Sequence, residues 1–484
     1  MLVPEDRIAS LSGGVPGNSV APEALANRSP ARIPHDYLPR IHRMASLNRK
    51  LEQITGGLRC AAVSDVGMRR SSNQDSLAIA LADSLQHWKS HGHLFVVADG
   101  MGAHAAGELA SQIATDNIPH GYHKLSDLSP SEAIVEAIRQ ANVKINNKGQ
   151  NSVDFQGMGT TCSCLLLLPC GAIAAHVGDS RVYRLRGDSL EQLTFDHSLV
   201  WEMAAAGHSS EDDIPAYVPK NVITRSLGPH PTVAVDLEGP FELEAGDRFL
   251  LCSDGLTGPL NPELIGMVLG SLPPSDAAQT LADLANLLGG PDNITAIVAE
   301  VIDPGSLGEA ASDNLSQSTT SSPIVRSRGV PPLTWIALLL CLILLGGFSL
   351  LGQLLPAILS GVGAVIVVVI AWAQHARADQ AGRLLTEVGL RGKAPYRRHL
   401  CVPSASSIEP LSDIVRQLED LEGQRDWSFN WEKIHKDRGQ AHEATARGDF
   451  HTAMVAYCSA VRRLMQALRE SRGLRPSDSS VDLG

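Results

Sequence analysis

The feature that most restricts how this chain can fold is a long stretch without charge. Residues 329–376 contain no Asp, Glu, Lys or Arg. Two apolar runs fill the stretch, residues 333–352 and residues 354–373, and each has about the 20 residues that a helix needs to cross a bilayer. Gly352 and Pro356 near their junction favour a turn. The sequence therefore predicts two transmembrane helices that form a hairpin.

Basic residues flank this stretch on both sides. Arg326 and Arg328 precede it, and it is followed by Arg377, Arg383, Arg391, Lys393, Arg397 and Arg398. Basic flanks favour the cytoplasmic side of a membrane, and a hairpin places both flanks on the same side. We therefore expect a multi-pass protein whose parts before and after the hairpin are both cytoplasmic. A buried hairpin in a large soluble core and a single long tilted span are the alternatives.

The rest of the chain divides into four regions. Residues 1–56 are rich in Pro, Ser, Ala and Gly and are predicted to be a disordered arm, with a short helix near residues 41–51. Residues 57–303 are predicted to form a globular domain. Residues 304–330 are rich in Ser and Thr and are predicted to be a flexible linker. Residues 375–484 are predicted to form an α-helical tail.

Charge and cysteine content exclude several classes of function. The chain has 40 Lys and Arg against 52 Asp and Glu, a net charge of −12, so we expect no binding to nucleic acid. Its 8 cysteines include no Cys-x-x-Cys pair, and most of them lie in apolar runs. This pattern argues against a zinc ribbon and against a disulfide scaffold, and it is typical of a reducing compartment.

Aspartates at the ends of predicted strands are the strongest candidates for chemistry. Asp99 and Asp254 each follow a short apolar run and precede a glycine. Asp179 follows another such run, and Asp292 comes two residues before the predicted strand 294–301. Carboxylates that converge at strand ends repel one another unless a hard cation such as Mg²⁺ or Mn²⁺ neutralises them. Four unrelated, solvated turns are the alternative.

Eight motifs, in their order along the globular domain, resemble those of the metal-dependent protein serine/threonine phosphatases of type 2C, the PPM family, in their bacterial form. The motifs are SDVG (64–67) with RSSNQD (70–75), VADGMGAH (97–104), MGTT (158–161), VGDSR (177–181), TFDHS (194–198), ITRSLG (223–228), CSDGL (252–256) and DNIT (292–295). The resemblance covers about half of the chain. It implies an α+β domain, a four-layer α/β/β/α sandwich of two antiparallel sheets, to which the transmembrane hairpin and the α-helical C-terminal region are added.

The same resemblance implies which residues bind metal. Asp99 is expected to bridge two Mn²⁺ or Mg²⁺ ions, and the Gly100 carbonyl is expected to be a further ligand. Asp254 and Asp292 are expected to complete the set around the first ion. Asp179 corresponds to an additional and weaker third metal site of the family.

Three residues of the RSSNQD motif receive other roles from the resemblance. Arg70 is expected to clamp the phosphoryl oxygens with its guanidinium fork, and a surface salt bridge is the alternative. Asp75 is expected to orient ligands or waters. Gln74 stands where many members carry Glu, so it would hold a metal-bound water without adding charge, and the second ion would bind less tightly. Met101 stands where some members carry a His that serves as general acid.

The resemblance implies an enzyme that hydrolyses phosphoserine and phosphothreonine in phosphorylated proteins, by in-line attack of a water that the metal ions activate. It would oppose a bacterial Ser/Thr kinase. Together with the predicted hairpin, this indicates a phosphatase anchored in the bacterial cytoplasmic (inner) membrane, with its catalytic domain and tail in the cytoplasm. A catalytically weak phosphatase fold that binds phosphoproteins as a sensor or scaffold is the alternative. Retention of Asp99, Asp254, Asp292 and Arg70 favours the enzyme.

The tail is expected to contain a tetratricopeptide-like pair of helices near residues 430–470. Gly448 and Asp449 break the helical pattern, and small or aromatic residues recur at helical spacing after the break. One such pair cannot bury its own apolar face, so we expect it to pack on residues 405–425 or on a second copy of the chain. Docking of a partner protein is one interpretation of this pair, and a plain helical bundle is the other.

Overall fold

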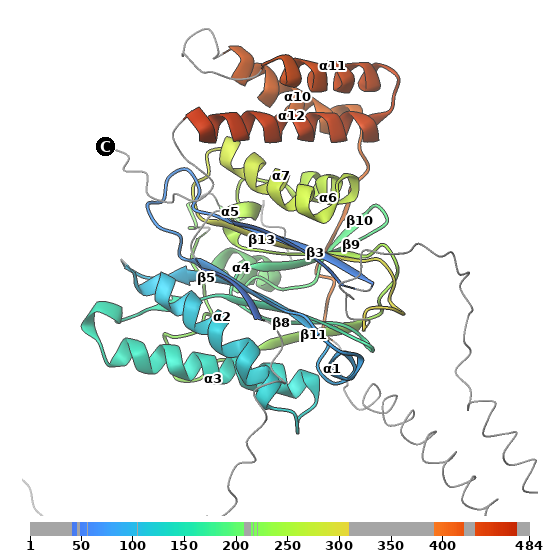
Figure 1. The fold of residues 1–484 in the computed structure, drawn as a ribbon. Helices are drawn as coiled ribbons and strands as arrows, with labels where there is room; N and C mark the ends of the chain where they lie inside the picture. Colours follow the sequence, from blue (N-terminus) through green and yellow to red (C-terminus); the bar gives the residue numbers. More distant parts are fainter. Residues whose placement is uncertain are drawn as a thin grey trace, which may run out of the picture. The chain divides into compact units, whose positions relative to one another are not determined.

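The computed structural model describes most of the globular domain and much of the tail. The described residues are 41–45, 49–55, 57–103, 105–207, 214–215, 217–219, 221–308, 392–420 and 431–471. Within them, two sheets lie face to face between layers of helices (Figure 1). All the strand pairings given for both sheets are antiparallel. The predicted sandwich of two antiparallel sheets is confirmed.

The first sheet has the strand order β1–β4–β5–β7–β8–β11, with β6 paired to β5. Its strands are β1 (Ile41–Ala45), β4 (Asp75–Ala80), β5 (His93–Met101), β6 (Gly159–Thr160), β7 (Cys162–Leu168), β8 (Gly171–Val177) and β11 (Asp236–Phe241). β4, β7 and β8 are buried along their whole length. A strand that is covered on both faces has a nearly continuous apolar sequence, as β7 does.

The second sheet has the strand order β14–β10–β9–β12–β13–β3–β2. Its strands are β2 (Arg49–Thr55), β3 (Leu58–Asp65), β9 (Arg181–Arg186), β10 (Ser189–Gln192), β12 (Arg248–Cys252), β13 (Ile294–Val301) and β14 (Arg397–Leu400). β13 has the bounds that the sequence predicted. The sheet joins segments from both ends of the described chain.

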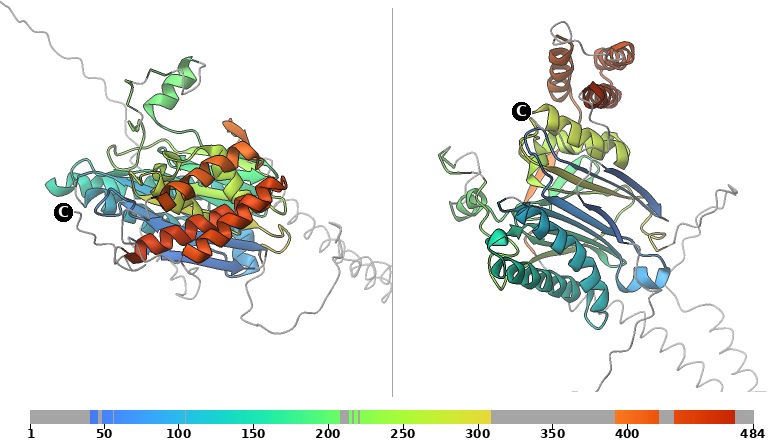
Figure 2. Two further views of the ribbon diagram at one scale, coloured as in Figure 1. Left: turned by 90° about the horizontal axis from the view of Figure 1, so that it is seen from above. Right: turned by 60° about the vertical axis from the view of Figure 1, so that its left-hand side comes forward.

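Helices cover the outer face of each sheet (Figures 1 and 2). α2 and α3 pack on the first sheet, and α6 and α7 pack on the second. Their bounds are α2 (Ala106–Lys124), α3 (Pro130–Gln150), α6 (Pro262–Ser271) and α7 (Pro274–Leu287). A capping box fixes the start of α3, because the Ser129 hydroxyl accepts from the Glu132 amide and the Glu132 carboxylate accepts from the Ser129 amide.

Apolar side chains form a core between the sheets and another core beneath each helical layer. Between the sheets, Leu77 and Phe95 of the first sheet lie in the same cluster as Phe249 and Leu251 of the second, and all four are fully buried. The core beneath α6 and α7 continues into the helices of the tail. The globular domain and the tail therefore share one hydrophobic core.

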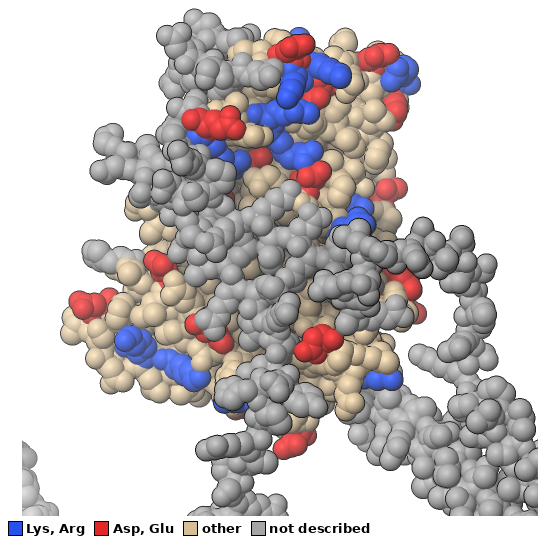
Figure 3. Space-filling view, in the orientation of Figure 1, with Lys and Arg blue, Asp and Glu red and all other residues tan. Residues whose placement is uncertain are grey.

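The tail contributes a strand, β14, and the helices α10 (Ala405–Asp420), α11 (Trp431–Ala446) and α12 (Phe450–Ser471). α12 packs against α10, α11, α6 and α7, so it is covered within the same chain. This is the packing on residues 405–425 that the sequence led us to expect. Docking of a partner protein on the pair α11 and α12 stays a prediction. On the face in Figure 3, basic and acidic side chains are interspersed over the helices at the top.

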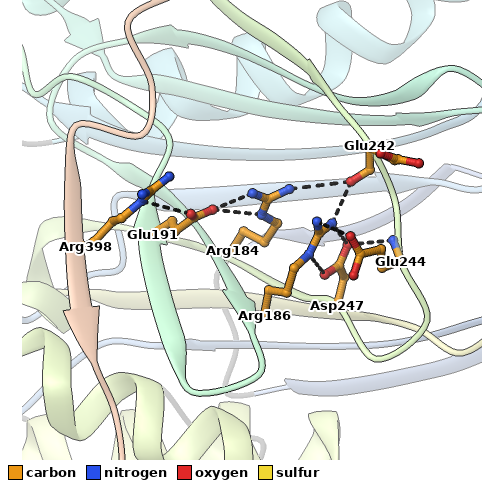
Figure 4. A network of polar contacts seen from close by, with 7 residues as sticks. All are labelled: Arg184, Arg186, Glu191, Glu242, Glu244, Asp247 and Arg398. Carbon is orange, nitrogen blue, oxygen red and sulfur yellow. Dashed lines mark hydrogen bonds and ion pairs between the residues drawn. The ribbon is translucent and has the colours of Figure 1, made fainter.

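β14 forms the edge of the second sheet, where a polar network holds it (Figure 4). Arg398 of β14 lies directly across from Glu191 of β10, and its Nε is 3.1 Å from Glu191 Oε1. Arg184 of β9 donates to the other oxygen of Glu191, with an Nε–Oε2 distance of 3.0 Å. Opposite charges on facing residues favour this register. The network therefore specifies where the tail attaches to the sheet.

Three expectations need correction. Residues 41–45 and 49–55 form strands, although the sequence suggested a disordered arm with a short helix. Residues 397–400, expected to belong to a purely helical tail, form β14. The domain also extends beyond residue 303, since Leu307 is buried against the core between the sheets. β1 and β14 pair with strands distant in the sequence, β4 and β10, so local sequence patterns do not reveal them, whereas β2 forms a hairpin with the neighbouring β3.

Several predictions fall outside the described residues. These are the hairpin of residues 333–352 and 354–373, most of the linker, and the arm up to residue 40. Among the helices that the structure does describe, none is both long enough and apolar enough to span a membrane. The hairpin is therefore still a prediction from sequence.

Candidate active site

Four of the predicted aspartates come from strand ends at one edge of the sandwich. Asp75 begins β4 and lies directly across from Asp99 of β5 in the first sheet. Asp254 follows β12 and begins the short helix α5 (Asp254–Thr257), and Asp292 lies two residues before the start of β13. Because β12 pairs with β13, these two lie at the same end of the second sheet. The two sheets thus bring two pairs of carboxylates together.

These aspartates lie close enough for their charges to interact. Burial, and after it the charges of the other aspartates, raise the pKa of Asp99 well above its usual value. Burial raises the pKa of Asp75 to about 7 and that of Asp179 to about 8, and Asp254 adds to both increases. Burial and the charge of Asp292 also raise the pKa of Asp254. The ionised forms of these carboxyl groups therefore destabilise one another.

The donor set at this site fits a hard divalent cation. Three carboxylate oxygens are buried and have no hydrogen-bond partner among the described residues: Asp75 Oδ1, Asp179 Oδ1 and Asp254 Oδ1. Leaving a buried carboxylate oxygen without a partner costs free energy. A divalent ion satisfies several such oxygens at once, and Mg²⁺ and Mn²⁺ prefer oxygen ligands. The residues present therefore match the metal chemistry that the sequence predicted.

Arg70 lies at the rim of this site. Its Nη2 donates to Asp292 Oδ2 at 2.7 Å, and 49% of its side chain is exposed. The salt bridge considered as the alternative role of Arg70 is present, but its partner is one of the predicted metal ligands. The guanidinium has five N–H donors, so a second anion can bind beside the carboxylate. Arg70 therefore lies beside a predicted metal ligand and keeps donors that are open to solvent.

Gln74 and the loop that carries Arg70 are held by Asn293. The Asn293 side chain accepts a hydrogen bond from the Gln74 amide at 2.8 Å and donates to the carbonyl groups of Val66 and Ser72. The Gln74 carbonyl in turn accepts a hydrogen bond from the Gly100 amide at 3.1 Å. Asn293 thus ties this loop to the start of β13. The sequence contained Asn293 within a motif but gave no sign of this role.

Two hydroxyl groups hold the aspartates in place. Ser253 donates to Asp75 Oδ2 at 2.7 Å, and its oxygen accepts from the Thr295 amide. The Thr161 hydroxyl accepts from the Asp99 amide at 2.9 Å. Sequence reasoning missed both roles, although both residues lie in the motifs. Ser253 directly precedes Asp254 at a strand end, which is a visible signal, whereas Thr161 has no aspartate near it in the sequence.

Gly100 occupies a position that only glycine fits. A Cβ atom there would lie 2.1 Å from the carbonyl oxygen of Gly107, in the first turn of α2. The start of α2 therefore packs directly against the backbone that follows Asp99. The close approach of these two backbone segments explains why glycine follows Asp99, and a turn is not needed to explain it.

His197 has a structural role. Its Nδ1 accepts a hydrogen bond from the Gly178 amide at 2.9 Å, and its Nε2 lies 2.9 Å from Asp236. Both ring nitrogens of His197 therefore contact groups of the protein itself. The bond to Gly178 positions the backbone just before Asp179. His104 lies outside the described residues.

Comparisons with known proteins agree with this site. Residues 69–292 match the family described as protein phosphatase 2C. A putative protein phosphatase 2C-type of Streptococcus pyogenes is 38% identical over 235 residues, which are 48% of this chain and 92% of that protein. Protein phosphatase PhpP of Streptococcus pneumoniae is 36% identical over 239 residues, which are 48% of this chain and 93% of that protein.

Solved structures give similar matches. The serine/threonine phosphatase PstP/Ppp of Mycobacterium tuberculosis is 35% identical, with coverage of 52% of this chain and 100% of that chain and a TM-score of 0.45. Another structure holds the catalytic domain of PstP in complex with two manganese ions. It is 35% identical, with coverage of 52% of this chain and 100% of that chain and a TM-score of 0.43.

Proposed function

This chain belongs to the protein phosphatase 2C family and is a protein serine/threonine phosphatase, and we propose that it hydrolyses phosphoserine and phosphothreonine in phosphorylated proteins with two Mn²⁺ or Mg²⁺ ions. One observation carries the metal dependence: buried aspartates from both sheets converge, and three of their oxygens have no partner among the described residues. Their mutual repulsion is relieved when divalent cations bind among them.

The residues proposed to hold the ions are those that the resemblance implies, and their placement at one edge of the sandwich supports this. Asp99, Asp254 and Asp292 would hold them, together with the Gly100 carbonyl. Asp179 has an unpartnered buried oxygen and would hold a third, weaker ion. The bound ions would supply an activated water and neutralise charge on the phosphoryl group.

The side chains around the ions would bind the substrate and orient water. Arg70 is exposed at the rim and would bind the phosphoryl oxygens through charge-assisted hydrogen bonds. Asp75 is held by Ser253 and would accept a hydrogen bond from a water or orient a ligand. Cysteine chemistry is disfavoured, because Cys162 and Cys164 are fully buried in β7 and burial raises the pKa of the Cys164 thiol. We therefore propose direct attack of water on phosphorus without a covalent phosphoenzyme.

A metal-dependence assay tests this proposal. The purified full chain is incubated with peptides of one sequence that carry phosphoserine, phosphothreonine or phosphotyrosine, in Mn²⁺, in Mg²⁺ or in excess chelator. We expect phosphate release from the first two peptides that depends on the added metal. Turnover that is unchanged in chelator would overturn the metal proposal. Tight peptide binding without turnover at any metal concentration would favour the sensor or scaffold instead.

We also propose that residues 333–373 anchor the protein in the bacterial cytoplasmic membrane as a helical hairpin. The sequence supports this through two uncharged runs and basic flanks. The fold adds an independent argument, because the residues up to 308 and those from 392 belong to one structure in which β14 pairs with β10. A segment whose two ends meet in one domain crosses a membrane an even number of times. The catalytic domain and tail would then both be cytoplasmic.

Localisation and partners have their own tests. The full chain should stay in the membrane fraction after alkaline extraction, and a reporter fused after Gly484 should indicate the cytoplasm. A soluble chain, or a periplasmic reporter signal, would contradict the hairpin. A Ser/Thr protein kinase pathway is the proposed counterpart. Cells with Asp254→Asn should then accumulate phosphoserine and phosphothreonine sites relative to the parent, as measured by phosphoproteomics, and an unchanged phosphoproteome would contradict this role.

A further inference from the structure

Three histidines meet at the end of α2 that is farther from the active site. His87 lies on the short helix α1 (Leu85–Ser90), His91 directly follows that helix, and His123 lies in the last turn of α2. One ligand nitrogen from each ring lies within 4.8 Å of those of the other two. The His87 and His123 ring centroids are 4.8 Å apart, and His91 lies 5.2 Å from His87 and 5.1 Å from His123.

Asp83 fixes the tautomer of His87. Its Oδ1 lies 3.2 Å from His87 Nδ1. A carboxylate only accepts hydrogen bonds, so Nδ1 carries the proton and Nε2 presents a lone pair. A carboxylate that accepts from one ring nitrogen while the other nitrogen faces a cation is the usual surrounding of a metal-bound histidine.

Ser90 favours the same tautomer in His91. The Ser90 hydroxyl donates to the carbonyl groups of Gln86 and His87, at 3.0 Å and 3.3 Å. With its hydrogen on a carbonyl group, the Ser90 oxygen accepts from His91 Nδ1 at 2.7 Å. In that tautomer His91 Nε2 presents a lone pair, the same kind of ligand atom as His87 Nε2.

The third ring faces the first. His123 Nδ1 lies 3.1 Å from His87 Nε2. Two imidazole nitrogens bound to one tetrahedral zinc, with bonds of about 2.0–2.1 Å, lie roughly 3.4 Å apart. The observed separation is thus close to that of two ligands of one ion. In the metal-free protein this contact is a hydrogen bond in which His123 Nδ1 donates to the lone pair of His87 Nε2, and a bound ion would replace it.

We propose that His87, His91 and His123 form a second metal site that binds Zn²⁺ or a similar transition-metal ion through three imidazoles. Imidazole suits Zn²⁺, Co²⁺, Ni²⁺ and Cu²⁺, whereas Mg²⁺ and Mn²⁺ prefer the oxygen ligands of the active site. Free imidazoles have a pKa near 6.5, so binding at pH 7.5 displaces few protons. Water would fill the remaining coordination position.

The site is separate from the active site and differs from it in chemistry. α2 begins beside Gly100, and His123 lies 17 residues after Ala106, which is about 26 Å along the helix. A bound ion would tie α1 to the end of α2, where the Tyr122 hydroxyl already donates to the His91 carbonyl at 2.7 Å. We therefore assign the ion a structural role, stabilising the domain rather than joining catalysis.

Zinc binding can be measured without interference from the active site. The full chain carrying Asp99→Asn and Asp254→Asn, which weaken metal binding at the active site, serves as the parent. It is stripped with chelator, dialysed against Zn²⁺ at pH 7.5 and analysed for metal content and thermal unfolding. We expect one bound zinc per chain and a higher melting temperature. Co²⁺ should give the intense visible absorption of tetrahedral nitrogen coordination.

Variants of the histidines decide the assignment. His91→Ala and His87→Asn should each weaken zinc binding at least tenfold and abolish the thermal shift. His120→Gln, on the same helix as His123 but outside the cluster, should bind zinc as the parent does. Metal-free melting curves of the variants show that they are folded. Absence of zinc from the parent, or zinc binding that survives both His91→Ala and His87→Asn, would overturn the proposal.

Discussion

Arg469 of α12 donates a hydrogen bond of 2.5 Å to the buried carboxylate of Asp283 on α7. The same guanidinium nitrogen lies 3.5 Å from Asp65 at the end of β3. The other oxygen of Asp65 accepts from the Gly67 amide, in the loop that leads to Arg70. The tail is thus linked through one arginine to the loop that carries Arg70, the residue proposed to bind phosphate.

Replacing Arg469 should destabilise the protein in a pH-dependent way. Burial raises the pKa of Asp283 to about 6 even with Arg469 beside it. In Arg469→Met the carboxylate loses its partner and its pKa rises further, so we expect a loss of about 3 kcal/mol in unfolding free energy at pH 8. The loss should be smaller at pH 5.5, because Asp283 is then protonated. Urea unfolding at both pH values measures this difference.

The control for Arg469→Met is Arg447→Met. Arg447 pairs with Glu443 at 2.7 Å, but both side chains are exposed, 60% and 69%. Exposed pairs contribute about 0–1 kcal/mol, so this variant should unfold nearly as the parent does at both pH values. Equal losses in the two variants would show that Asp283 does not depend on Arg469.

Asp254→Asn should separate stability from activity. It removes a buried charge that its neighbours repel, so the melting temperature of the metal-free protein should rise by a few degrees. Phosphatase activity should fall by at least about 100-fold, since even residues behind metal ligands contribute 10–100-fold. Asp236→Asn is the control: His197 and Arg225 lower the pKa of Asp236 to about 2, so its loss should lower stability. A destabilised Asp254→Asn with full activity would contradict the assigned ligand.

Arg70→Ala should reduce kcat/KM for a phosphopeptide by roughly 10–100-fold, about 1.4–2.8 kcal/mol of lost transition-state binding. Arg70→Lys keeps the charge but not the fork, so it should recover part of the loss. The neighbouring exposed Arg69 provides the control, and Arg69→Ala should have nearly normal steady-state kinetics. A larger effect at Arg69 than at Arg70 would mean that the clamp is wrongly assigned.

His93 should make stability depend on pH below 6.5. Its Nδ1 accepts from the Ala82 amide, its Nε2 donates to the Leu307 carbonyl, and burial lowers its pKa to about 4. The unfolded chain binds this proton near pH 6.5, so the contribution of neutral His93 is complete above that pH and is lost as the pH falls towards 4. The loss is about 1.4 kcal/mol per pH unit, or roughly 2 kcal/mol between pH 6.5 and pH 5.

The measurement compares the parent with His93→Gln by urea unfolding at pH 7.5 and pH 5.0, with chelator in all samples. The difference in unfolding free energy between the two proteins should shrink by roughly 2 kcal/mol at the lower pH. For the exposed His230→Gln the difference should stay constant. A constant difference for His93→Gln as well would show that His93 is protonated in the folded protein.

The sequence predicted much of the catalytic half of this molecule because the signals there are local. A buried strand has a continuous apolar run, and an aspartate at its end marks the edge of the sheet. β13 has the predicted bounds, and Asp99 and Asp254 lie where their strands end. Residues that work through distant partners were not predictable. Asn293 bonds to a loop more than 200 positions away, and nothing in its neighbourhood indicates that contact.

The same limit applies to the rest of the fold. Two edge strands, β1 and β14, pair with segments distant in the sequence, and β14 has only four residues with no apolar alternation. The spacing of His87 and His91 is visible in the sequence, but His123 joins them only because α2 returns along the first sheet. Local sequence therefore indicates which chemical groups a segment carries, and the fold determines which other residues those groups contact.

The attachment of β14 to β10 has a consequence for the integrity of the enzyme. The pieces on either side of residues 309–391 adhere through strand pairing, a shared apolar core and the ion pair of Arg469, and none of these needs the covalent connection. A chain cleaved once in that interval should therefore run as a single species on a native gel and as two fragments after denaturation. Proteolysis there would break the covalent connection between the catalytic domain and the tail but would leave the two pieces bound to each other.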